Sequence, residues 1–413
     1  MNIDNVLKNS INFLLGEMSI NDSNSMAKGG FYGFQNIYEP LRDTDMPFIF
    51  YEITGYGINL LLKLYDWYLD EKYLDMAKNA GECILRAQII SKDVKTNGAI
   101  YDRYYPHSRK FFESFHVYPN AVCLGGLCEI YNKTRDNRFL QSAISIKNWL
   151  FQMIVKENDQ VLGFYEFYSP NQESLKVYPY ESICIPFILL KFQKELKLSQ
   201  SEIKQLTDSA KWGIDSQIIH GYFPFFYSLE KKEFNNTAYS HFTIYPLYNL
   251  MGFPLEELEK YGVENSFDSY KKCGEWMTRV QDENGGFFTY YFGDDHVWHQ
   301  QSPAVAQALC SFTLLYEKTN DKKFLDAARK AVRWLVKNQI QDVKFSGSFY
   351  WVYPNKKYSN FQKKIMYAKE LIKNRISENE QVKDVTVLLD KTPIWSVQFA
   401  IEGLYRYKKY DSS

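Results

Sequence analysis

The sequence predicts an all-α protein, a closed (α/α)6 toroid in which six inner helices alternate along the chain with six outer helices. Two repeated features indicate this fold: a helical hairpin with a short polar turn, and a glycine followed by aromatic residues after each outer helix. Repeated units pack on their immediate neighbours, so the number of repeats sets the number of helices. We expect the toroid to occupy residues 1–413 as a single domain.

The helical hairpin is clearest in three segments of similar sequence. They are YDWYLDEKYLDMAKNAGECIL from Tyr65, YNKTRDNRFLQSAISIKNWLF from Tyr131 and YEKTNDKKFLDAARKAVRWLV from Tyr316. In the turns, Asp70, Asp136 and Asp321 are placed to cap the helix that follows. The helix before each turn is apolar almost all round, whereas the helix after it is amphipathic. The first kind is therefore expected inside the ring and the second on its outer surface.

Weaker copies of the hairpin fill the remaining stretches of the chain. YESICIPFILLKF precedes EIKQLTDSAKWGI, and FTIYPLYNLM precedes FDSYKKCGEWMTRV. The segment PIWSVQFAIEGLYRY has the inner pattern without an outer helix after it, and IDNVLKNSINFLLG, at the other end, has the outer pattern. Pairing of these two segments would close the ring.

A glycine followed by aromatic residues comes after every predicted outer helix. The six glycines are Gly29, Gly98, Gly163, Gly221, Gly285 and Gly347. We interpret each as a left-handed cap that ends its outer helix. The six aromatic connections would then lead to the inner helices on one face of the ring, as short strands or loops. The segment 356–391 is too long for such a connection and is expected to hold an inserted helix or a lid.

Composition narrows the class of ligand. Lys plus Arg and Asp plus Glu both number 49, so there is no excess of positive charge to neutralise a nucleic acid backbone. Aromatic residues make up 17% of the chain, with 33 Tyr and 30 Phe. Tyrosine offers a flat apolar face with a hydrogen-bonding tip, which suits a ligand that has both apolar faces and hydroxyl groups.

The absence of a membrane-spanning run and of a signal peptide pattern indicates the cellular compartment. It contains no apolar run of about 18 residues that could cross a bilayer, and Asp4, Lys8 and Glu17 interrupt the N-terminal segment where a signal peptide would be apolar. The six cysteines show no paired spacing and are expected to be reduced core thiols. We therefore expect a cytoplasmic protein without a membrane span.

The candidate site lies at the N-termini of the inner helices, which converge on the centre of such a ring and favour anionic groups. The candidate catalytic residues are Glu52, Glu181, His116, His241 and His299. The candidate substrate-binding residues are Tyr51, Tyr56, Asp102, Arg103, Tyr118, Tyr178, Tyr180, Tyr245, Trp298, Gln300 and Trp395. Because Glu52 and Glu181 stand beside tyrosines at the start of apolar helices, raised pKa values are expected. Alternatively, such acids compensate helix dipoles and the histidines cap helices.

A metal site is not indicated. His296 and His299 are suitably close in sequence, but no cysteine or carboxylate at helical spacing completes a zinc ligand set. We expect neither a metal nor a cofactor.

Six motifs, YEITGYGINLLL, FHVYPNAVCLGGL, YPYESI, SHFTIYPLYNL, SPAVAQALCSFTLLYEKTND and TPIWSVQFAIEGL, make the chain resemble the (α/α)6 toroid superfamily of carbohydrate-active enzymes. The resemblance covers essentially the whole chain, and the superfamily includes glucuronyl hydrolases, glucuronyl C5-epimerase-like proteins and alginate-lyase-like proteins. More narrowly, the order of the motifs is similar to toroids encoded with polysaccharide-biosynthesis genes. The resemblance implies an oligosaccharide or polysaccharide substrate and, as partners, polysaccharide-assembly proteins.

Residue types leave three activities open. A glycoside hydrolase needs two carboxyl groups beside the bond, which Glu52 and Glu181 could supply. A uronate lyase or C5-epimerase needs a base, such as a histidine or tyrosine, and a group that neutralises the enolate, such as Arg103. A glycan-binding scaffold without catalysis would keep the aromatic residues and need no acid or base. The leading expectation is an enzyme that cleaves or modifies an oligosaccharide or a uronate-containing glycan.

Overall fold

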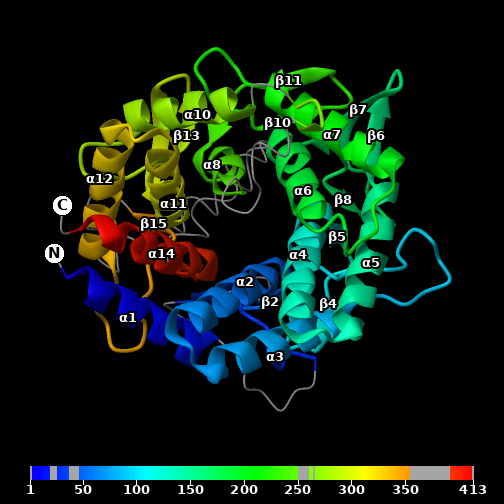
Figure 1. Ribbon diagram of the computed structural model, residues 1–413, viewed down its shortest axis with the longest axis horizontal. Coiled ribbons are helices and arrows are strands. Elements are labelled where there is room, and N and C mark those ends of the chain that lie inside the picture. Colours follow the sequence, from blue (N-terminus) through cyan, green and yellow to red (C-terminus); the bar gives the residue numbers. More distant parts are fainter. Residues whose placement is uncertain are drawn as a thin grey trace, which may run out of the picture.

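The computed structural model describes residues 2–18, 26–36, 46–249, 260–263, 266–353 and 391–411. Within these ranges the chain forms two concentric rings of helices (Figure 1). The inner helices are α2 (Tyr51–Tyr68), α4 (Val117–Thr134), α6 (Pro179–Lys191), α8 (Ser240–Asn249), α11 (Ser302–Thr319) and α14 (Ile394–Tyr407). The outer helices are α1 (Ile3–Phe13), α3 (Glu71–Ala87), α5 (Asn137–Gln152), α7 (Gln200–Asp215), α10 (Ser266–Val280) and α12 (Lys322–Asn338). The predicted (α/α)6 toroid is confirmed.

The two ends of the described chain close the ring as the repeat pattern predicts. Inner helix α14 packs against both α11 and α2, and outer helix α1 packs against α14 and α12. Short turns extend both end helices: the π-helical turn η1 (Leu14–Met18) follows α1, and the 3-10 turn η5 (Lys408–Tyr410) follows α14. The inner helices thus form an unbroken circle (Figure 1).

The hairpin turns have the geometry that their sequence predicts. Inner helix α2 ends at Leu69 in a left-handed conformation, and the Leu69 N–H donates to the Tyr65 carbonyl at 2.8 Å. Asp70 then accepts a hydrogen bond from the Lys72 N–H at 3.1 Å and caps α3. Asp136 and Asp321 cap α5 and α12 in the same way. A polar side chain at this position satisfies a backbone donor that the helix leaves unpaired.

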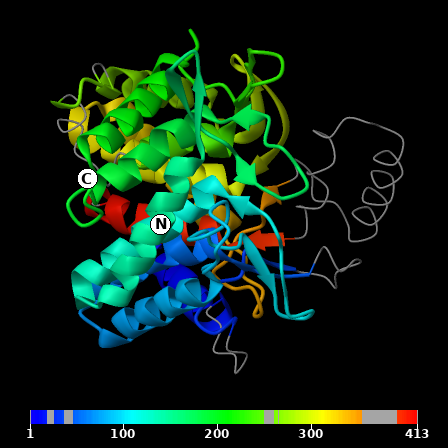
Figure 2. The same ribbon diagram turned by 90° about the vertical axis from the view of Figure 1, so that its right-hand side faces the viewer.

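Short strands occupy the connections from outer to inner helices. They are β1 (Phe34–Asn36), β2 (Ile49–Phe50), β3 (Arg103–Tyr105), β4 (Lys110–Phe111), β5 (Phe115–His116), β6 (Ile154–Glu157), β7 (Gln160–Phe164), β8 (Phe167–Tyr168), β9 (Lys176–Val177), β10 (Phe226–Ser228), β11 (Glu233–Asn235), β12 (Ala238–Tyr239), β13 (Phe288–Phe292), β14 (Asp295–Gln301), β15 (Val352–Tyr353) and β16 (Lys391–Pro393). Figure 2 shows them gathered on one side of the helical ring.

These strands link each connection to the next around the whole ring. The antiparallel pairs β2 with β3, β5 with β8, β9 with β10, β12 with β13, and β14 with β15 join successive connections, and β1 with β16 joins the first to the last. Each inner helix begins directly after one strand of such a pair, or one residue later in the case of α6. The belt of strands therefore fixes where the first turn of each inner helix starts.

The repeated glycines are left-handed, as expected, but they do not cap the outer helices. Helix α3 ends at Ala87, well before Gly98, and the Gln88 that follows it is extended. A Cβ atom on Gly98 would collide with the Ser145 carbonyl of the next outer helix, and one on Gly347 would collide with the Asn9 carbonyl of α1. The glycines are needed because the connection passes so close to the neighbouring helix. The cap interpretation is therefore wrong.

Glutamine side chains reinforce the same junctions. Gln88 Nε2 donates to the Gly98 carbonyl and to the Ser142 carbonyl of α5, both at 3.0 Å. Gln217, Gln281 and Gln339 make equivalent bridges from their connections to α10, α12 and α1. Buried backbone acceptors are thereby satisfied, and adjacent outer helices are held at a fixed spacing.

Three further predictions concern the cysteines, a membrane span and the segment 356–391. All six cysteines are free and buried, which confirms the prediction of core thiols. Within the described ranges no helix is long and apolar enough to cross a membrane. The expected helix or lid at 356–391 lies outside the described residues, apart from Lys391 at the start of β16.

Candidate active site

Four tyrosines from different inner helices meet at the centre of the ring. Tyr56, Tyr118, Tyr180 and Tyr245, here called the tyrosine cluster, are all buried. The Tyr56 and Tyr118 hydroxyls are 2.6 Å apart, and the Tyr180 and Tyr245 rings stack with centroids at 5.7 Å. Because these residues stand in the first or second turn of α2, α4, α6 and α8, the start of each helix brings them together.

A polar chain runs beside the tyrosine cluster. His241 Nδ1 lies 2.9 Å from Gln307 Oε1, and His241 Nε2 lies 3.2 Å from the Tyr245 hydroxyl. An amide oxygen only accepts, so Nδ1 carries the proton and Nε2 accepts from Tyr245. Tyr245 is also a hydrogen-bond partner of Glu52. The chain therefore connects a carboxyl group, a phenol and an imidazole whose tautomer is fixed.

Burial sets the protonation states of this chain. Burial, followed by the charge of Asp102, raises the pKa of Glu52 to about 8, against the opposing effects of Tyr245 and Arg103. Burial lowers the pKa of His241 to about 3. Burial disfavours the charged form of either group. Near neutral pH the site thus holds a protonated carboxylic acid and a neutral imidazole that are linked through Tyr245, and Glu52 is partly exposed to solvent.

Glu181 is a second acid with a raised pKa at the same centre. Its Oε1 accepts a hydrogen bond from the Tyr180 hydroxyl at 2.8 Å. Burial raises its pKa well above the ordinary value. Among the described residues, Glu181 Oε2 and Trp395 Nε1 have no hydrogen-bond partner, although both side chains are buried. The Trp395 ring stacks on His241 with centroids 6.0 Å apart, so both unused groups belong to the same interior.

Asp102 and Arg103 act on the site as a pair. Arg103 Nε lies 2.6 Å from Asp102 Oδ2, and the guanidinium lies over the Phe48 and Phe112 rings. Asp102 is 1% exposed. Since the Arg103 charge is engaged by Asp102, the pair does not offer a free cation to an anionic ligand. Its visible effect is the repulsion that Asp102 exerts on ionised Glu52.

The structure brings some predicted site residues together and leaves others apart. Tyr51 is buried beside Cys83 and Cys123, where helix α2 faces its neighbours. Gln300 accepts from Trp334 Nε1 and donates to Asp282, so its amide is used in a structural network. Neither residue lies in the tyrosine cluster.

Four further predicted residues lie nearer the strand belt. The His116 ring contacts Phe167, and His299 is half-buried in β14, where burial lowers its pKa. Tyr178 donates to Glu166 at 3.3 Å and contacts Tyr180. The Trp298 side chain lies outside what the structure describes.

Gln307 contacts the candidate site and was not among the residues predicted from the sequence. It is the sixth residue of α11, the position that Tyr56 has in α2 and Tyr245 has in α8. A signal was available, because Gln307 is a large polar residue within the apolar run AVAQALC. Such a residue in a buried helix needs a buried partner, which here is His241.

Comparison with known proteins supports the fold. No protein-family model and no curated protein sequence matches the chain. Solved structures similar to it include a D-mannose isomerase (12% identity, TM-score 0.68, covering 99% of this chain and 97% of that one) and the cellobiose 2-epimerase from Bacillus thermoamylovorans (13%, 0.65, 98% and 100%). A possible member of the GH105 family from Salmonella enterica is also similar (12%, 0.64, 99% and 94%). At these identities the likeness establishes the shared toroid, and function must be argued from the site.

Proposed function

We propose that this protein is a carbohydrate-active enzyme of the sugar epimerase or isomerase type, which moves a proton on a neutral sugar inside the ring. The observation that carries this proposal is the chain of Glu52, Tyr245 and His241, in which a protonated acid and a neutral base share one tyrosine hydroxyl. The similar solved structures include a D-mannose isomerase and a cellobiose 2-epimerase, which favours the same class.

The proposed chemistry preserves charge within a buried site. Glu52 gives its proton to the carbonyl oxygen of an open-chain sugar, while His241 Nε2 takes a proton from the neighbouring carbon. The enediol that forms is neutral, and Glu52 and His241 become an ion pair bridged by Tyr245. Each charge lowers the cost of the other in this low-dielectric setting. Return of the proton to either carbon, or either face, completes isomerisation or epimerisation.

Hydrolysis by a carboxylate pair has less support. That reaction needs one ionised carboxyl group as nucleophile or base. The pKa values of Glu52 and Glu181 are both raised, which disfavours the ionised form of either group. A uronate substrate is also disfavoured, because Arg103 is engaged by Asp102. These two observations favour a neutral sugar over a uronate glycan as the substrate.

The test is incubation of the protein with a panel of neutral reducing sugars in deuterated water, read by proton NMR. We expect deuterium to enter the carbon beside the carbonyl of at least one sugar. Glu52→Gln should reduce the rate about 10²- to 10⁴-fold, as is usual for loss of a general acid. Glu283→Gln, at an exposed position, is the matched control and should leave the rate unchanged. Cleavage of a glycosidic bond without deuterium incorporation would contradict the proposal and indicate a hydrolase.

A further inference from the structure

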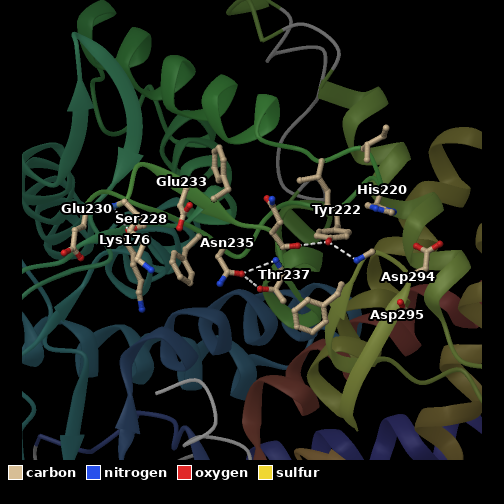
Figure 3. Close-up of a pocket in the computed structure, with 18 of the residues that line it drawn as sticks. Lys176, His220, Tyr222, Ser228, Glu230, Glu233, Asn235, Thr237, Asp294 and Asp295 are labelled. Atoms are coloured by element: carbon tan, nitrogen blue, oxygen red, sulfur yellow. Dashed lines mark hydrogen bonds between the residues drawn. The ribbon is translucent and has the colours of Figure 1, made fainter. Parts of the chain in front are cut away.

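A concave site lies among three successive connections of the strand belt. A cavity of about 1200 Å³ is lined on one side by strands β9, β10 and β11 and on the other by the turn between β13 and β14. Figure 3 shows Asn235 and Thr237 in the middle of this cavity, between Lys176 and Glu230 on one side and Asp294 and His220 on the other. None of these residues belongs to the tyrosine cluster.

Exposed apolar side chains line this cavity. Phe292 is 55% exposed and Ile219 is 99% exposed, and both contribute to the wall. The half-buried rings of Phe226 and Phe234 lie on the opposite strands. Aromatic rings left open to solvent in a concave surface are typical of ligand-binding sites. A flat ring of this kind suits the apolar face of a sugar.

The polar lining favours a neutral ligand rich in hydroxyl groups. Carboxylates outnumber ammonium groups in the wall: Glu230, Glu233, Asp294 and Asp295 against Lys176 and Lys231. An anionic glycan would be repelled by this excess, whereas sugar hydroxyls can donate to the carboxylates. The amide of Asn235 and the hydroxyls of Ser228 and Thr237 can add further bonds.

The turn that carries Phe292 and Asp294 is held in place. The Gly293 N–H donates to the Tyr222 hydroxyl at 3.1 Å, and the Gly293 carbonyl accepts from Trp276 Nε1 at 3.2 Å. Tyr222 is itself buried and donates to the Asn236 carbonyl at 2.7 Å, which ties this turn to the segment after β11. A wall fixed before binding loses less conformational entropy when the ligand arrives.

A continuous series of aromatic contacts joins the cavity to the tyrosine cluster. Phe226 contacts Tyr178 at 6.2 Å between ring centroids, Tyr178 contacts Tyr180 at 5.6 Å, and Tyr180 stacks on Tyr245 at 5.7 Å. A parallel contact runs from Phe225 to Phe242, both half-buried. Because Tyr178, Tyr180 and Tyr245 are buried, these contacts pack the wall of the cavity onto the tyrosine cluster.

We infer that this cavity binds a neutral oligosaccharide, with a sugar ring stacked on Phe292 and sugar hydroxyls donating to the carboxylates of the wall. The inference rests on the proposed function for the choice of ligand class, and it extends that function from a free monosaccharide to an oligosaccharide.

The test is calorimetric titration of the full chain with neutral β-linked gluco- and manno-oligosaccharides, from monosaccharide to hexasaccharide. For the unaltered protein, affinity should rise with chain length. The double variant Phe292→Ala with Asp295→Asn should bind the longer sugars about tenfold more weakly, which is the size expected for one lost stacking contact with its hydrogen bond. Val343→Ala, at an apolar position 98% exposed outside this cavity, is the control and should retain the affinity.

The outcomes separate this inference from the proposed function. Length-dependent binding that the double variant loses supports the cavity, even if no sugar exchanges deuterium, in which case only the proposed function fails. Affinity independent of length, or an equal length dependence in the variant, overturns the inference. Binding of a lysine-rich peptide to the cavity, with no oligosaccharide bound, would overturn it as well.

Discussion

At the scale of single residues, the proposed proton transfer depends on the hydrogen bond between Gln307 and His241. The Gln307 carbonyl oxygen keeps the proton on Nδ1, and Nε2 is left as the acceptor that the proposed reaction needs. The sequence could place His241, Glu52 and the tyrosines at the ring centre, because all stand near the start of inner helices. It could not show that Tyr51 faces elsewhere, since adjacent helical residues differ by about 100° in direction.

We predict that Gln307→Glu raises the pKa of His241. A carboxylate facing Nδ1 would stabilise the imidazolium and raise the pKa of His241 from about 3. NMR titration of the histidine should show the rise. An unchanged pKa would show that Gln307 does not set the state of His241.

The pKa of Glu52 predicts how activity and stability depend on pH. Activity should fall as pH rises through about 8, where the proton donor ionises. The folded pKa lies above the unfolded value of 4.5, so this group contributes fully to stability below about pH 4.5 and loses that contribution as pH rises towards 8. The melting temperature of Glu52→Gln should therefore gain on that of the unaltered protein across this window. A difference in melting temperature between the two proteins that stays constant from pH 5 to 8 would count against the raised pKa of Glu52.

At the scale of elements, local patterns predicted the helices well and the role of the glycines poorly. The hairpins follow from residues adjacent in sequence: an apolar helix, a left-handed residue and an aspartate cap. Gly98 and Gly347 depend instead on helices far away in sequence, because their hydrogen atoms face the carbonyls of Ser145 and Asn9. A left-handed glycine near a helix end suggests a cap, and the close approach that explains it appears only in three dimensions.

We predict that Gly347→Ala destabilises the protein by about 2 kcal/mol or more, because the added Cβ would meet the Asn9 carbonyl and the backbone φ of 97° is strained for alanine. Gly16→Ala is the control, since a Cβ there has open space. Thermal and urea unfolding should show a loss for the first variant and little change for the second. Equal stabilities would refute the packing role of Gly347.

At the scale of the whole molecule, closure joins segments from the two ends of the described chain. Strand β1 pairs with β16, and α1 packs on α12 and α14. The repeat count predicted this closure, because an unpaired inner helix at one end matched an unpaired outer helix at the other. The protonation states were only partly predicted. The sequence predicts raised pKa values for the acids, whereas the burial that keeps His241 neutral follows from the assembled ring.

Closure also makes the chain dependent on its first helix. Deletion of residues 1–18 would uncover the apolar surfaces of α12 and α14 on which α1 packs. We predict that this truncated chain melts at a markedly lower temperature and binds more of an apolar dye than the full chain. A truncated protein with unchanged melting temperature would show that the other helices close the ring without α1.

The proposed function requires Glu52 and His241 to act as one acid and base unit on a neutral sugar. The most direct measurement is the rate of deuterium incorporation from solvent into the sugar for the unaltered protein, Glu52→Gln, His241→Asn and the double variant. Residues that act as a unit are non-additive, so each single variant should lose nearly as much rate as the double variant. Additive losses of rate in the double variant, or single variants that exchange deuterium at the full rate, would show that Glu52 and His241 do not act as one unit.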